Sequence, residues 1–151
     1  MKYCKALCFS IMFSIVLLSC GKDNSFSVNK SINALQKEGW TISETPYSNE
    51  EITEIINNEF KDYFEVQIIE SYITLLGPDT LPNDDPNWVP PRTVHFITFS
   101  NQKDAETYYY HFLEETKIEK SNVYIGIHEK TYVDTNLKEA TKYINVEFTL
   151  I

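Results

Sequence analysis

The chain has 151 residues, of which 22 are acidic and 13 are basic, so its formal net charge is −9. An acidic surface repels phosphate backbones, so we expect no binding to nucleic acid. The length fits one domain of common size, large enough to be stabilised by burial of apolar side chains alone.

The first twenty residues differ in character from the rest of the chain. Lys2 and Lys5 precede a short apolar segment, residues 6–18, which ends at Ser19-Cys20. A basic start, a short apolar run and a small residue before the cut are the features of a secretory signal. The apolar segment is shorter than the ~20 residues that a membrane-spanning helix needs. A plain N-terminal membrane helix is therefore the less favoured alternative.

The end of this segment, Leu17-Leu18-Ser19-Cys20, resembles the lipobox of bacterial lipoproteins. The resemblance implies lipid on the Cys20 thiol, cleavage between Ser19 and Cys20, acylation of the new amino terminus and anchoring in the cell envelope. The following Lys22-Asp23 is similar to the surface-export signal of Bacteroidetes lipoproteins, which favours the outer membrane, facing the periplasm or the surface, over the inner one. The expected organisation is a signal peptide (1–19), a lipidated cysteine with a flexible tether (20–29) and a single α+β domain (30–151).

Charge and cysteine positions agree with this interpretation. Cys4, Cys8 and Cys20 all lie at or before the cut, so the folded domain has no thiol. Removal of Lys2 and Lys5 would change the formal charge from −9 to near −11. Such a surface is not attracted to anionic headgroups, so lipid is expected to hold the protein at the membrane.

The first half of the domain is predicted to contain two helices and two strands. Its most specific signal is a capping box, in which Ser48 satisfies a backbone N–H of the second helix and Glu51 reaches back. In chain order the segments are a helix over 28–38, a strand over 40–44, the second helix with an apolar stripe at Ile52, Ile55, Ile56 and Phe60, and a β-rich run over 64–76 that changes phase at Ile68-Ile69.

A proline-rich loop, residues 77–91, precedes the second half, since proline cannot donate a hydrogen bond to a sheet. Ser100-Asn101 is predicted to cap the third helix, whose stripe has the spacing i, i+3, i+4, i+7, i+8. The segments are a strand over 93–99, the third helix with Ala105, Tyr108, Tyr109, Phe112 and Leu113 in its stripe, a strand over 123–128, a short helix near 136–143 and a last strand over 145–150.

This order of elements predicts the α+β class. We expect a ferredoxin-like split βαβ sandwich, an antiparallel sheet with helices on one face, plus an extra N-terminal helix and a C-terminal helix–strand. In Phe99–Glu115 a strand ending in Phe-Ser leads into an acidic helix that carries Ala and Tyr. This stretch is similar to a segment of small uncharacterised bacterial lipoproteins, a resemblance that implies no activity.

Patterns that would indicate catalysis are missing from the sequence. His95, His111 and His128 are isolated, whereas zinc ligands are usually paired closely in sequence. The acids of the proline-rich loop lack EF-hand spacing, and there is no Gly-x-Ser-x-Gly elbow. We therefore expect no enzyme, no metal and no cofactor.

Aromatic residues are the more informative group, at 14% of the chain. Trp88 lies among prolines, and Tyr110 and His111 fall outside the stripe of the third helix. Tyr72 and Tyr124 are expected on the sheet face opposite the helices. Exposed aromatic residues are frequent hot spots of interfaces, so Trp88, Tyr110 and His111 are candidate partner-binding residues. The alternative is that the loop or the terminal elements cover them.

Three functions are consistent with these observations. The first is a non-enzymatic, lipid-anchored module that binds another envelope or secreted protein. The second is an immunity-type inhibitor of a secreted toxin, because an acidic surface speeds capture of a basic protein. The third is an envelope hydrolase, which would require acids or histidines to converge in a pocket.

Overall fold

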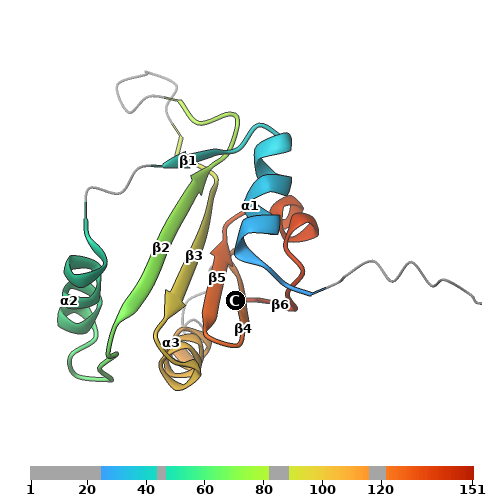
Figure 1. Cartoon of the computed structure of the whole chain (residues 1–151). Coiled ribbons are helices and arrows are strands. Elements are labelled where there is room, and N and C mark those ends of the chain that lie inside the picture. The colour runs from blue at the N-terminus through green and yellow to red at the C-terminus, as the bar shows by residue number, and fades with distance from the viewer. Residues whose placement is uncertain (1–24, 44–46, 82–88, 116–121) are drawn as a thin grey trace, which may run out of the picture.

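The computed structural model describes residues 25–43, 47–81, 89–115 and 122–151 (Figure 1). These ranges contain both helices and strands. They are α1 (Val28–Lys37), β1 (Thr41–Ser43), α2 (Asn49–Glu59), β2 (Ile69–Leu76), β3 (Thr93–Phe99), α3 (Gln102–Glu115), β4 (Tyr124–His128), β5 (Thr131–Thr135), the 3-10 helix η1 (Lys138–Tyr143) and β6 (Phe148–Leu150).

The strands of the described ranges form one sheet in the order β1-β2-β3-β5-β4-β6, and each pair is antiparallel. The α+β class with an antiparallel sheet is therefore confirmed. The strand order differs from that of a split βαβ unit, which would insert another strand between β1 and β2. Here α2 carries the chain to the far end of the sheet, so β2 runs back beside the short β1 and pairs with it directly (Figure 1).

Both faces of this sheet are covered, and successive residues of a strand therefore enter different cores. In β3, Ile97 faces the first core and Phe96 the second. The first core lies between the sheet and α2 and α3, and includes Ile52, Ile56, Phe60, Ile69, Ile97, Phe99, Ala105, Tyr108, Ile125 and Tyr132. The second core lies between the sheet and α1 and η1, and includes Ile32, Leu35, Trp40, Leu75, Val94, Phe96, Val133, Ala140 and Ile144.

The helix starts follow the predicted capping chemistry. Ser48 accepts a hydrogen bond from the Glu51 N–H, and the Glu51 carboxylate accepts one from the Ser48 N–H, which completes the capping box of α2. At α3, the Asn101 side chain accepts from the Asp104 N–H at 2.9 Å. The predicted apolar stripes of both helices face the first core, except Ile55, which is 46% exposed.

Strand β5 is the main element that the sequence did not predict. It lies in the middle of the sheet, between β3 and β4. The hairpin that joins it to β4 turns at Glu129-Lys130, where Glu129 has a φ of 51°. A non-glycine residue seldom adopts this conformation. The turn has Glu-Lys where tight hairpins usually have Asn-Gly or Asp-Gly, and the sequence therefore did not indicate a hairpin here.

Strand β2 is shorter than the predicted β-rich run and begins at Ile69. Its register shifts between Ile69 and Ser71, slightly later than the predicted bulge. As a result Tyr72 lies opposite Ile97 and faces the first core with α2 and α3. The prediction that Tyr72 lies on the face opposite the helices is therefore wrong. Tyr124, which alternates with Ile125 of the first core, does lie on the opposite face.

The last strand, β6, pairs with β4 at one edge of the sheet, and the Ile151 N–H donates to the Val123 carbonyl at 2.9 Å. Among the helices of the described ranges, none combines the length and the apolar character required to cross a membrane.

Candidate functional site

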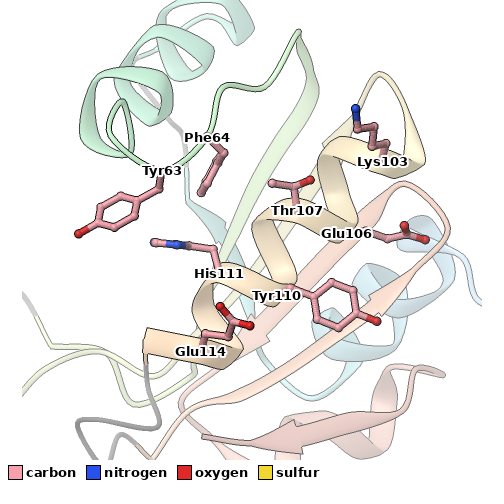
Figure 2. Close-up of a pocket in the computed structure, with 8 residues that line it drawn as sticks. All are labelled: Tyr63, Phe64, Lys103, Glu106, Thr107, Tyr110, His111 and Glu114. Carbon is pink, nitrogen blue, oxygen red and sulfur yellow. The ribbon is translucent and has the colours of Figure 1, made fainter.

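An open groove lies between the turn after α2 and the outer face of α3 (Figure 2). Its volume is about 470 Å³. The described residues that line it come from these two segments. They are Tyr63 and Phe64 from the turn, and Lys103, Glu106, Thr107, Tyr110, His111 and Glu114 from α3.

The α3 residues of the groove form a second stripe beside the buried one. Their positions, 103, 106–107, 110–111 and 114, repeat every three to four residues, which places them on one face of the helix. The buried stripe, which includes Ala105 and Tyr108, points toward the sheet. One face of helix α3 thus packs in the core, and another lines the groove.

The other wall of the groove is held in place by hydrogen bonds from both helices. The Asn57 side chain donates to the Val66 carbonyl at 2.9 Å and accepts from the Val66 N–H at 2.8 Å. Thr53 accepts from the Ile69 N–H at 3.0 Å. From α3, the buried Asp104 carboxylate accepts from the Gln67 N–H at 2.8 Å. These bonds fix the segment that follows Tyr63 and Phe64.

Aromatic rings pack closely at the bottom of the groove. The centroid of the His111 ring lies 4.8 Å from that of Tyr63, 5.0 Å from Phe60 and 5.2 Å from Phe64. Figure 2 shows His111 directed toward Tyr63, whereas Tyr110 extends to the other side of α3. Tyr63 and Tyr110 remain 67% and 57% exposed. The groove therefore combines a packed aromatic floor with two tyrosines that are open to a partner.

Charge in the groove is slightly negative. The described lining carries two carboxylates, Glu106 and Glu114, and one amine, Lys103, which matches the acidic character of the whole chain. A partner surface with Lys or Arg beside an apolar side chain would complement both features.

A second group of polar side chains lies on the face of the sheet that α2 and α3 cover. Cross-strand pairing places Thr74 of β2, His95 of β3 and Asp134 of β5 in one row. His95 Nδ1 is 3.0 Å from Thr74 Oγ1 and 3.4 Å from the Tyr72 hydroxyl. Burial lowers the pKa of His95, so the imidazole is neutral at pH 7.

Burial is the main cause of the pKa shifts of Asp134 and of two neighbouring tyrosines. Burial raises the pKa of Asp134 to about 7, and a hydrogen bond with Tyr132 partly opposes the shift. Burial, followed by the charge of Asp134, raises the pKa of both Tyr108 and Tyr132. Uncharged forms are therefore favoured throughout this group.

The predicted site residues have different outcomes. Tyr110 and His111 both line the groove, one exposed and one partly buried, but their side chains point to different sides of α3 (Figure 2). Trp88, Ser19 and Cys20 lie outside the described residues.

The sequence did not single out Tyr63 and Phe64, which complete the groove. They follow the end of α2, where helical periodicity no longer applies. A pair of adjacent aromatic residues a few positions after the end of a helix was their only signal.

The three histidines lie on separate elements. His95 is on β3, His111 on α3 and His128 on β4, where its ring lies 5.0 Å from that of Phe26. Within the described ranges, no three His, Cys, Asp or Glu side chains gather in a way that could hold a metal ion.

No protein-family model matches this chain, and no curated protein or solved structure is significantly similar to it. The geometry itself therefore defines the class: an α+β domain whose antiparallel sheet is covered on both faces and whose third helix borders an open aromatic groove.

Proposed function

We propose that this chain is a lipid-anchored protein of the cell envelope whose domain binds another envelope or secreted protein without catalysing a reaction. The observation that carries the binding function is the groove, in which Tyr63 and Tyr110 stay exposed beside a packed aromatic floor. The lipobox resemblance at Cys20 supports the anchor.

The chemistry of the groove indicates what kind of partner it takes. Tyrosines supply a large contact area at a low cost in conformational entropy. Glu106 and Glu114 favour a basic neighbour over an acidic one. We expect the partner to insert an apolar or aromatic side chain that is flanked by Lys or Arg.

The groove is tested by affinity capture from envelope extracts with the full chain, comparing wild type with Tyr110→Ala. Tyr47→Ala is the matched control, because Tyr47 is 52% exposed and does not line the groove. We expect a stoichiometric partner that is lost with Tyr110→Ala and retained with Tyr47→Ala. Equal recovery of every captured protein by the three chains would exclude the groove as the binding surface.

The same experiment separates the module from an immunity-type inhibitor. Both bind a protein, and the net charge of −9 suits a basic toxin. If the partner lost with Tyr110→Ala is a secreted toxin, its activity should fall on addition of wild type and persist with the variant. An envelope component as the partner would instead support the general binding module.

A hydrolase is the weaker alternative. His111, Glu106 and Glu114 all line the groove, and imidazole and carboxylate are the groups used in acid–base chemistry. However, the groove is open and Glu114 is exposed, whereas catalytic sites usually exclude water from their charged groups. Hydrolysis of envelope material that His111→Gln abolishes would reverse this ranking.

A further inference from the structure

A separate pocket of about 270 Å³ lies between α2 and the sheet. Three isoleucines of α2 form its apolar wall, namely Ile52, Ile55 and Ile56. Tyr47, Tyr72, Tyr108 and Glu59 form the remainder of the lining. Among the described residues it shares no lining residue with the groove beside α3.

The formal charge in the described lining of this pocket is negative. Glu59 is the one ionisable acid in the described lining, and no Lys, Arg or His accompanies it. Glu59 is also the last residue of α2, where the helix dipole adds negative potential. Asp134, whose pKa burial raises to about 7, acts electrostatically on both Tyr72 and Tyr108 and adds negative charge only in its ionised form.

His95, the basic group that contacts Tyr72, does not offset this potential. The Tyr72 hydroxyl is 3.4 Å from His95, whose burial keeps the imidazole neutral. The described lining of the pocket is therefore mainly apolar and aromatic, with three tyrosines, and its one charged group is negative.

We propose that this pocket binds a small organic cation, an ammonium group that carries short alkyl substituents. Tyrosine rings attract such cations through their quadrupoles, and aromatic pockets recognise quaternary ammonium groups in this way. The isoleucines would contact the alkyl substituents, and Glu59 would balance the charge. An anion would meet only negative potential. A neutral apolar molecule would leave the tyrosines and Glu59 without a role.

The isoleucines provide a direct readout. The full chain is labelled at its isoleucine δ1 methyl groups, kept in an uncharged maltoside detergent and titrated with choline by NMR. We expect saturable shifts at Ile52, Ile55 and Ile56 and none at Ile144, which lies in the second core. The neutral isostere 3,3-dimethylbutan-1-ol, which has the same shape without the charge, should bind at least about 5-fold more weakly.

Two variants test the residues. Tyr47→Ala should weaken choline binding by roughly 2- to 30-fold, the range for loss of one cation–π contact. Glu59→Gln should weaken it by up to about 5-fold, as for an exposed ion pair. Their controls are Tyr110→Ala, in the other groove, and Glu54→Gln, an exposed acid of α2 outside the pocket.

The outcomes divide clearly. Choline-specific shifts that Tyr47→Ala and Glu59→Gln weaken, while the controls do not, would support the proposal. Equal affinity for choline and its neutral isostere, or no shift with choline, would overturn it. The groove and this pocket have different described lining residues. A negative result with choline therefore does not bear on protein binding at the groove.

Discussion

Asp134 couples the stability of the domain to pH. Its pKa rises from 3.8 to about 7 on folding, so the folded protein holds the proton more tightly than the unfolded chain. The contribution of this group to stability is therefore largest below pH 3.8 and is lost as the pH rises to about 7. We predict that Asp134→Asn raises the free energy of unfolding at pH 8, on the order of 2–4 kcal/mol at about 1.4 kcal/mol per pKa unit.

Urea unfolding of both proteins at pH 4, 5.5, 7 and 8 measures this effect as the difference between them. The difference should grow with pH and level off above 7. His95 would give the opposite sign, because its pKa is lowered and its contribution is lost as the pH falls below 6.5. A difference that does not change with pH would show that Asp134 titrates normally.

Asp104 links the two walls of the groove. Its carboxylate accepts hydrogen bonds from the Gln67 N–H and, at 2.9 Å, from the Asn101 side chain. Asp104→Ala should lower the free energy of unfolding by about 1–3 kcal/mol, since it leaves a partly buried donor without a partner. Asp62→Ala, at an exposed acid, is the control for lost charge.

Thermal and urea unfolding measure the cost, and hydrogen exchange at the Gln67 amide locates it. We expect faster exchange at this amide in Asp104→Ala than in Asp62→Ala. If both variants lose the same stability, general charge effects explain the result and the hydrogen bond at Gln67 contributes little.

Individual side chains were predictable from the sequence where helical periodicity applied. The stripe of α3 placed Tyr108 in the core and left Tyr110 and His111 outside it, as the structure has them. Tyr72 could not be placed in this way. Both faces of its strand are buried, so apolar residues do not tell which face is which, and a small error in the position of the bulge reverses every side chain.

At the scale of elements, Gly126 of β4 allows the chain before β6 to approach the sheet. A Cβ atom at this position would lie 2.6 Å from Val146 Cγ1 and 2.9 Å from the Glu147 carbonyl oxygen. The second of these is backbone, so the segment itself must move to accommodate a larger residue. Gly126→Ala should therefore lower the free energy of unfolding by about 1–3 kcal/mol, as overpacking does.

This destabilisation should be concentrated in β6, because the displaced segment leads directly into that strand. Hydrogen exchange should rise for the amides of Phe148–Leu150 more than for those of β3. Uniform exchange across the sheet, with an unchanged melting temperature, would contradict the close approach at Gly126.

The sequence misplaced β1 and missed β5, and both errors have the same cause. The capping box at Ser48 and the cap at Asn101 are local, and both were predicted correctly. The position of β1 beside β2 and the presence of β5 depend on pairing between distant segments. A strand such as Thr131–Thr135, which carries polar residues and enters through a turn without glycine, is recognised only when its neighbours are known.

For the whole molecule, surface charge and membrane attachment are separate problems. A formal charge of −9, or near −11 without Lys2 and Lys5, gives no attraction to anionic headgroups. Each buried CH₂ of a lipid chain contributes about 0.8 kcal/mol, so two or more acyl chains on Cys20 would be sufficient to anchor the protein. The proposed anchor therefore depends on this cysteine alone.

Replacement of residues 1–20 by a cleavable signal without a cysteine tests this dependence. We predict that the wild-type protein stays in the membrane fraction through a high-salt wash and leaves it only with detergent. The replaced form should move to the soluble fraction. Cys20→Ala alone is a poorer test, because an uncleaved apolar segment would itself retain the chain. If the replaced form remains with the membrane, the folded domain contacts lipid or a membrane protein directly, and the groove beside α3 becomes the first surface to examine.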